Sequence, residues 1–313
     1  MRSLRRMTAG LGRAVAWPRL VAVTWLANLL VALPAAVMLG DRLRRSVGKS
    51  EAGERLLEGF DFSWHGEFMS DAEGLERTFE PGRLVTGGWL ENLDGWWSGR
   101  LFEQPAAILA FGGLFTLVWI LLSAGVVAHY HRPPQRFRLA EFLADGGGFF
   151  FRFLRLSLIS APIYYGIFRL ARWLFPSIED AMRDVTAERT VLVYNLLAAL
   201  VIVVLIATVK MGFDYARIAM VVEERRSSLL AALRGLGFVV RRPLVTWGLL
   251  LSFALLGLVL LALRLWLVPG VGQQSILAIL AVFLLGQAFL LARLGLRLGL
   301  LAAELALYED ETP

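Results

Sequence analysis

The stretch DYARIAMVVEERRSSLLAALRGLGFVVRRP (residues 214–243) lies between two strongly apolar runs of the 313-residue chain. It contains six arginines, three acidic residues and two serines. The runs that flank it, 191–211 and 244–268, each reach the roughly 20 residues that a helix needs to cross the hydrocarbon core of a bilayer. A charged segment between two such runs is typical of a loop on one side of a membrane.

The whole chain has the composition of a membrane protein. Hydrophobic residues make up 57% of it, more than a soluble domain normally carries. Four further apolar runs fall at 20–39, 106–128, 149–175 and 276–294. We therefore predict an all-α fold, an integral membrane six-helix bundle with a small extracytoplasmic helical cap. The last five spans make up residues 105–313.

The first apolar run follows a basic tail, residues 1–19, which contains five arginines. A cleaved signal peptide has the same order of charge and apolar sequence. The run 20–39 is long, however, and no small-x-small cleavage site follows it. We expect an uncleaved membrane anchor.

The distribution of arginine predicts the orientation of the bundle. The basic tail, the loop 131–148 and the opening stretch carry most of the arginines, whereas the short loops 176–188 and 269–275 carry only Arg183. Short cytoplasmic loops are enriched in Lys and Arg. Both termini and the opening stretch should therefore lie in the cytoplasm.

Charge and cysteine content exclude several classes of function. The net charge is +6, and the chain has thirty arginines but only two lysines and no cysteine. We attribute the excess of arginine to codon bias in a GC-rich genome, and we expect no nucleic-acid partner. The lack of cysteine excludes disulfides, thiolate metal sites and cysteine nucleophiles.

The segment 40–104 differs from the other loops, because it holds thirteen acidic residues against eight basic ones. We expect short helices that lie as a cap on the outer face of the bundle. Within it, DFSWHGEFMSD (61–71) offers four oxygen or nitrogen ligands for a metal ion. They are Asp61, His65, Glu67 and Asp71. The alternative is an aromatic interfacial segment with solvated acids.

Three charged residues follow each other on one helix face at the end of the predicted fourth span. Lys210, Asp214 and Arg217 have the spacing i, i+4 and i+7, at which two cations can pair with one aspartate. The cluster is a candidate for gating or proton relay, since charge near hydrocarbon is costly. The alternative is an interfacial anchor whose long side chains extend to water.

The opening stretch also has the pattern of an amphipathic helix at a membrane surface. Ile218, Val222, Leu229, Leu233, Leu236 and Val240 recur at near-helical spacing with arginines between them. The segment 131–156 repeats this theme, and arginines near an anionic leaflet each contribute about 1 kcal/mol of attraction. We predict a cytoplasmic surface for anionic lipid headgroups or a protein partner. Its candidate residues are Arg136, Arg138, Arg152, Arg155, Arg225, Arg226 and Arg234.

The last span, LARLGLRLGLLAAELALYE (291–309), carries a polar stripe. Arg293, Arg297 and Glu304 fall within about 40° of one another at 100° per residue. The stripe could line a hydrophilic cavity, or it could pair with Asp214 or Glu223 and tie helices together. The apolar pattern is longer than the bilayer is thick, so we expect this helix to extend into the cytoplasm.

No catalytic motif is recognisable. The chain has no Walker A loop, no GxSxG elbow, no HExxH and no dinucleotide-binding fingerprint. We expect no enzymatic activity and no cofactor, with a metal-dependent activity on the outer face as the one open alternative.

The tracts GGGFFFRFLRL (146–156) and 214–243 resemble uncharacterised six-helix bacterial inner-membrane proteins, among them the membrane domains attached to some glycerophosphodiester phosphodiesterases. The resemblance implies a six-span bundle in a bacterial cytoplasmic membrane, and it carries no phosphodiesterase activity because that domain is missing. A shorter tract, EERRSSLLAALRGLG (223–237), is similar to the coupling loop of ATP-driven permeases. Two hypotheses follow. The first is a non-enzymatic membrane scaffold or accessory subunit, and the second is a transporter or permease subunit.

Overall fold

The computed structural model describes residues 2–48, 52–58, 60–80, 106–183, 187–267 and 275–312. Within these ranges the chain is helical and has no β-strand, which confirms the all-α class. In chain order the elements are α1 (Arg2–Ala16), α2 (Pro18–Val47), α3 (Ala52–Glu58), α4 (Phe62–Ser70), η1 (Gly74–Thr78), α7 (Ala106–His131), α8 (Leu139–Ala181), α9 (Glu188–Val222), α10 (Ser228–Arg241), α11 (Pro243–Leu267) and α12 (Ile276–Glu311).

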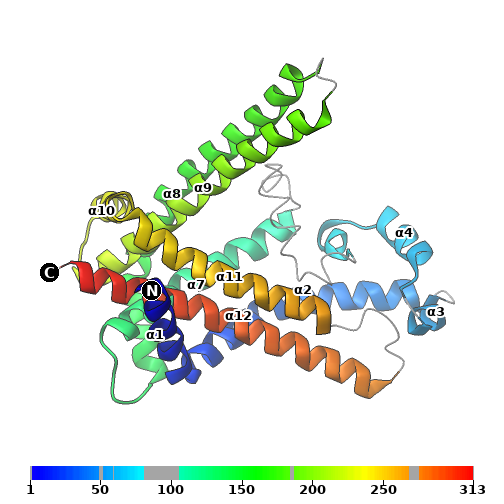
Figure 1. Ribbon diagram of the computed structural model, residues 1–313. Helices are drawn as coiled ribbons and strands as arrows, with labels where there is room; N and C mark the ends of the chain where they lie inside the picture. The colour runs from blue at the N-terminus through cyan, green and yellow to red at the C-terminus, as the bar shows by residue number, and fades with distance from the viewer. Residues whose placement is uncertain are drawn as a thin grey trace.

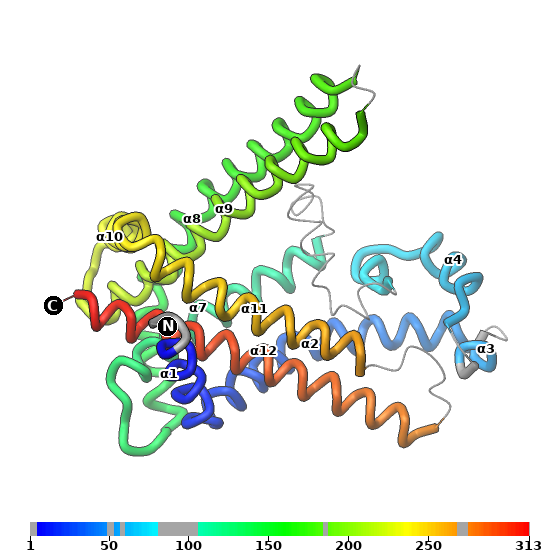
Figure 2. The backbone as a smooth tube through the Cα atoms, in the orientation of Figure 1, coloured from blue at the N-terminus to red at the C-terminus, as the bar shows by residue number. Residues whose placement is uncertain are grey.

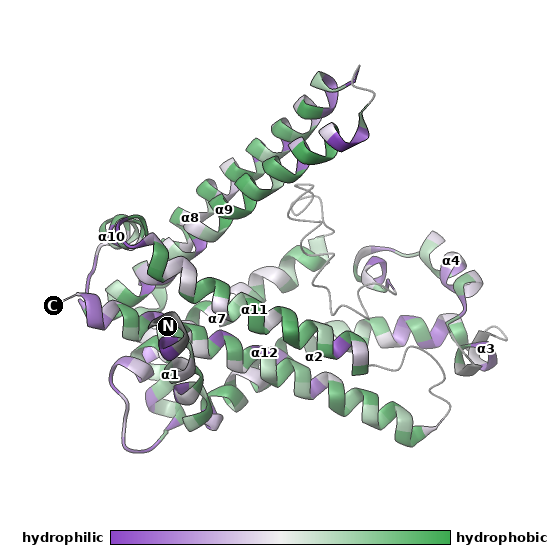
Figure 3. Cartoon of the chain, in the orientation of Figure 1, coloured by the Kyte–Doolittle hydropathy of each residue, from purple (hydrophilic) through white to green (hydrophobic). Residues whose placement is uncertain are grey.

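Five of the described helices, α2, α7, α9, α11 and α12, are long and apolar enough to cross a membrane. At most 22% of the most apolar 18-residue window in each is buried inside the protein. Figure 3 shows these apolar lengths as largely hydrophobic helices. Apolar side chains that the protein itself leaves uncovered are suited to lipid rather than to water.

The helices are arranged in two arms that share one end (Figures 1 and 2). An antiparallel pair, α8 and α9, diverges from a second group that contains α2, α7, α11 and α12. Where the arms meet, the end of α7, the start of α8, the C-terminal parts of α9 and α12, and α1 and α10 pack into one continuous core. We call this shared end the base. It contains most of the fully buried side chains, for example Tyr215, Phe153 and Tyr308.

The helix predicted for 149–175 begins ten residues earlier, at Leu139, and runs without a break through the three glycines 146–148. These glycines do not interrupt the helix, and the first of them packs closely against α7. A Cβ on Gly146 would lie 2.7 Å from the carbonyl oxygen of Leu121, and one on Gly125 would lie 2.8 Å from Phe142. The missing side chains let α7 and α8 approach closely, as small residues do between membrane helices.

The predicted basic tail is also a helix. Residues 2–16 form α1, which packs against α12 and α11. A Cβ on Gly10 would lie 2.5 Å from the carbonyl oxygen of Gly299, so the two helices cross at a pair of glycines. Arg6 pairs with Asp310 at 3.4 Å. Of the three glycines in α12, Gly299 makes this close contact, whereas nothing lies within 4 Å of a Cβ on Gly286 or Gly295.

The segment 40–104, which we predicted to form the cap, begins as a continuation of α2, which ends at Val47 instead of near residue 39. The short helices α3 and α4 follow, and Asp61 caps α4 by accepting from the backbone nitrogens of Ser63 and Trp64. Trp64 and Phe68 form the centre of a small apolar cluster. η1 contacts α2 and α7. The rest of the predicted cap, 81–104, lies outside the described residues.

Candidate functional site

Two groups of charged residues that are far apart in the sequence meet between α9 and α12. Asp214 accepts hydrogen bonds from Lys210 Nζ at 2.6 Å and from Arg217 Nη1 at 3.0 Å. Arg297 and Glu304 on α12 interact electrostatically with Asp214. Asp214 is 6% exposed and Glu304 is 2% exposed. The predicted span-four cluster and the predicted polar stripe therefore form one charge network.

The charge network also reaches α7. The guanidinium carbon of Arg297 lies 3.3 Å from the centre of the Trp119 ring, a cation–π contact whose strength rises when water is excluded. Arg293, one turn earlier on α12, acts electrostatically on Arg297. The network thus connects three helices of the base, which is what a structural role requires.

Two features of the charge network are not explained by helix packing. Glu304 Oε2 is buried and has no hydrogen-bond partner among the residues that the structure describes. The Lys210 side chain is 45% exposed although its amine pairs with the buried Asp214. Lys210 therefore links the protein surface to the buried carboxylates.

The amphipathic helix predicted in the opening stretch is α10, and Ser227 caps its first turn. Its inner face is buried against α9 through Ala231, Ala232, Gly235, Phe238 and Val239. Its outer face exposes large apolar side chains, each between 54% and 70% exposed. They are Leu229, Leu230, Leu233 and Val240. Ile218 and Val222, which we had placed on the same stripe, belong to α9 instead, because the chain turns at 223–227.

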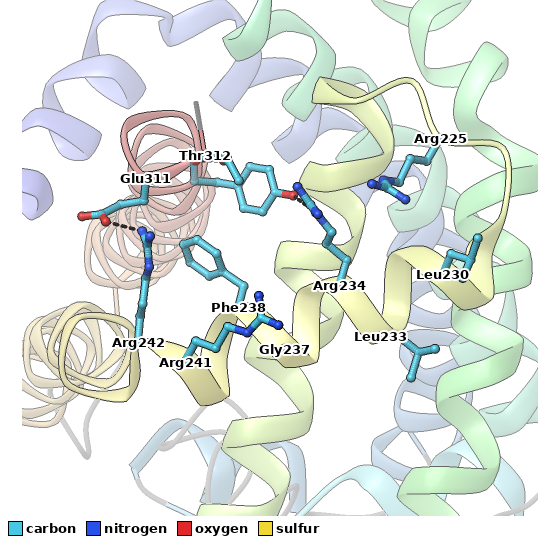
Figure 4. Close-up of a pocket in the computed structure, with 11 residues that line it drawn as sticks. Arg225, Leu230, Leu233, Arg234, Gly237, Phe238, Arg241, Arg242, Glu311 and Thr312 are labelled. Atoms are coloured by element: carbon cyan, nitrogen blue, oxygen red, sulfur yellow. Dashed lines mark hydrogen bonds and ion pairs between the residues drawn. The ribbon is translucent and has the colours of Figure 1, made fainter.

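A cavity of about 420 Å³ lies between α10 and the end of α12 (Figure 4). Four arginines line it together with Tyr308 and Glu311. They are Arg225, Arg234, Arg241 and Arg242. Figure 4 shows the guanidinium groups of Arg225 and Arg241 pointing toward Arg234 from two sides. We call this cavity the basic pocket.

Acidic side chains hold part of the rim of the basic pocket in place. Glu223 accepts from the hydroxyl of Tyr308, from Arg225, and from Arg234 Nε at 3.0 Å. Burial raises the pKa of Glu223, but the hydrogen bond from Tyr308 and the two arginines more than offset this effect, so that its pKa lies below the ordinary value of 4.5. Glu223 is therefore ionised at neutral pH and fixes both arginines.

A second cavity, of about 440 Å³, lies at the other end of α10, against α8. Arg155 and Arg226 line it, with Ser227, Ser228 and three aliphatic side chains. Ser228 Oγ donates to the backbone oxygen of Arg152 at 3.2 Å, which joins α10 to α8. Arginine-lined cavities thus flank α10 on two sides.

The remaining residues of the predicted lipid or partner surface lie around the start of α8. The Arg152 guanidinium lies over the Phe149 ring, 5.3 Å from its centre. Arg138 pairs with Glu141 at 3.0 Å, and Arg136 is exposed. These three residues are not among those that line either cavity on α10.

The four predicted metal ligands of the segment 40–104 make other contacts. Asp61 caps α4 and pairs with Arg55 at 2.8 Å. His65 Nε2 lies 2.8 Å from the carbonyl oxygen of Phe79. Glu67 is exposed, and Asp71 caps the end of α4. Among the described residues, no group of three or more His, Cys, Asp or Glu side chains is placed to hold a metal ion.

Three members of the pocket were not predicted from the sequence, namely Arg241, Arg242 and Glu311. Arg234 and Arg241 are seven residues apart, a spacing that places them on one helix face. Arg241 could therefore have been predicted from the sequence. Arg242 lies just beyond α10, and Glu311 comes from a helix 69 residues later that only the fold brings close. No spacing rule connects those two.

No family model matches the chain, and no curated protein and no solved structure matches it.

Proposed function

We propose that this chain is a non-enzymatic, multi-pass membrane scaffold or accessory subunit that binds anionic lipid headgroups through α10 and the cavities beside it. The observation that carries the proposal is the surface of α10. Its exposed leucines lie beside Arg234 and Arg241, and Arg226 lies just before its first residue. A helix with this composition lies in the plane of a membrane, with its apolar side chains at the acyl boundary and its cations at the phosphates.

Six membrane crossings are part of the proposal, with α8 as the sixth helix. α8 has lower apolarity because it carries Arg152, Arg155, Arg169 and Arg172. Its 43 residues nevertheless run antiparallel to α9 and pack along it. α7 ends at the base, and α9 also ends there. The chain must therefore leave the base through α8 before α9 can run back to it. If α9 crosses a membrane, α8 crosses with it.

The proposed location is a bacterial inner membrane, with both termini and α10 on the cytoplasmic side and α3, α4 and η1 outside. Arginine distribution supports this orientation. The contact of α1 with the end of α12 is consistent with it, because it puts both ends of the described chain at the base.

Lipid selectivity tests the proposal directly. The full chain is purified in mild detergent with equal amounts of phosphatidylglycerol and phosphatidylethanolamine, and retained lipids are counted by native mass spectrometry. We expect phosphatidylglycerol to be enriched. The triple variant R226Q/R234Q/R241Q should lose this enrichment, whereas R44Q/R55Q/R183Q, which removes the same charge from the outer side, should keep it. Equal retention of both lipids by the wild type would contradict the proposal. A stoichiometric protein in place of lipid would favour a protein partner.

A transporter is the second candidate, and the buried carboxylates favour it. Glu304 Oε2 has no hydrogen-bond partner among the described residues, and the half-exposed Lys210 reaches the same charge network. Ionisable groups inside membrane helices often mark ion or proton pathways.

Proteoliposomes separate the two candidates. If the charge network conducts protons, vesicles containing the wild-type protein will dissipate an imposed pH gradient faster than vesicles containing E304Q. The scaffold proposal expects both to behave like protein-free vesicles.

A further inference from the structure

The basic pocket carries more positive charge than its own surroundings neutralise. Its lining has four arginines and one acid, Glu311. Glu223, which lies behind the lining, pairs with Arg225 and Arg234. Even when this acid is counted, the site keeps a net charge of about +2, since arginine is always protonated. A cavity of this size and charge is suited to a phosphate group with room beside it.

The arginines of the pocket are not equally engaged. Arg242 pairs with Glu311, which also accepts from Arg6 at 3.3 Å. Among the residues that the structure describes, none forms a hydrogen bond or ion pair with the Arg241 guanidinium, although Figure 4 shows it directed into the pocket. An entering anion would therefore meet Arg241 first and would compete with Glu311 for Arg242.

One wall of the pocket is apolar and exposed. Leu230 and Leu233 line it, and they are 54% and 60% exposed. A free phosphate ion would gain nothing from these side chains. The glycerol and first methylenes of a phospholipid would cover them, and each buried methylene contributes about 0.8 kcal/mol. Basic pockets on the cytoplasmic side of membrane bundles hold lipid headgroups in this way.

We infer that the basic pocket is a stoichiometric site for the phosphate of one anionic phospholipid. In this site Arg234, Arg241 and Arg242 bind the phosphate oxygens. The Glu311 carboxylate competes with the phosphate for Arg242. The inference rests on the proposed function, because it assigns one defined site within the surface that α10 presents to the leaflet.

Titration with a short-chain lipid tests this site. The full chain in mild detergent is titrated with dioctanoyl phosphatidylglycerol, and separately with inorganic phosphate. We expect one lipid per chain and at least roughly tenfold weaker binding of inorganic phosphate. Arg241→Gln should weaken lipid binding by roughly tenfold, the loss expected for one charge-assisted hydrogen bond. Tight binding of inorganic phosphate would overturn the assignment to a lipid and indicate a soluble phosphate compound.

Glu311→Gln tests the site by an expected gain in lipid affinity, which a misfolded variant would not show. Freeing Arg242 from its ion pair should tighten lipid binding by about two- to fivefold. The matched control is Arg13→Gln, which removes one charge from an exposed position of α1 at the base, outside the pocket, and should leave the affinity unchanged. If Arg13→Gln and Arg241→Gln weaken binding equally, the site inference fails while the proposed leaflet binding stands. If neither the wild type nor any variant binds the anionic lipid, both the site inference and the proposed leaflet binding fail.

Discussion

Gly235 of α10 lies so close to Gly212 of α9 that a Cβ added to Gly235 would come within 2.1 Å of the Gly212 carbonyl oxygen. The same Cβ would lie 2.5 Å from the backbone nitrogen of Ala216. Both obstacles are backbone atoms, so a rotamer change cannot relieve them. The contact fixes α10 on α9 and turns its leucines and arginines outward, which makes it the basis of the proposed lipid-binding surface.

The first prediction concerns this contact. Gly235→Ala should destabilise the protein by about 1–3 kcal/mol, because α10 must move away from α9. Thermal unfolding in mild detergent measures the effect. Gly237→Ala is the control on the same helix, where nothing lies within 4 Å of the added Cβ. It should stabilise the helix slightly, by about 0.5–1 kcal/mol. Equal stability of the two variants would show that the close contact does not hold.

The second prediction concerns the charge network. Asp214→Asn removes the carboxylate charge that Lys210 and Arg217 share as their ion-pair partner. Loss of one partner from a buried ion pair costs about 3–5 kcal/mol, and we expect a loss in this range because Asp214 is only 6% exposed. Asp180→Asn is the control, since the Asp180 and Arg183 side chains are 69% and 79% exposed. Its effect should stay below about 1 kcal/mol. A similar unfolding temperature for both variants would argue against a buried network.

The third prediction concerns pH. The pKa of Glu223 is lowered in the folded protein, so its ionised form is favoured by folding. Its contribution to stability is therefore present above 4.5, the ordinary value, and is lost as the pH falls through the lower folded value. Glu223→Gln should be less stable than the wild type at pH 7, and the difference should shrink toward zero in acid. Unfolding temperatures measured across this range provide the test, and a constant difference would contradict the assignment.

Local features of the structure follow closely from the sequence. The period of apolar residues predicts the all-α class and the long apolar helices, and the serine before α10 is a helix cap that a reader of the sequence can find. The last helix extends to Glu311, well past 294, as its long apolar pattern predicts. At 36 residues it is about 54 Å long, longer than a bilayer core. These features depend on neighbours in the chain.

Features that depend on distant neighbours could not be predicted. The glycines 146–148 suggest a hinge by propensity, but packing against α7 keeps the helix continuous. The helix of the basic tail packs with Gly10 against Gly299 of α12, a contact between residues far apart in the chain. The meeting of Arg297 with Trp119, and of Glu311 with Arg242, joins residues that no periodicity relates. Both sites were therefore recognisable from the sequence only in part.

The proposed lipid site requires α10 to lie at the cytoplasmic face of the membrane. The chain has no cysteine, so single cysteines can be introduced at exposed positions without removing any native one. Suitable positions are Glu54 in α3, Arg183 near the tip of the α8–α9 arm, and Arg226 just before α10.

The decisive measurement is labelling of these three single-cysteine variants in intact bacterial cells with a maleimide that cannot cross the membrane. We predict that E54C and R183C react from outside, and that R226C reacts only after the cells are permeabilised. Reaction of R226C in intact cells would place α10 outside and contradict the account.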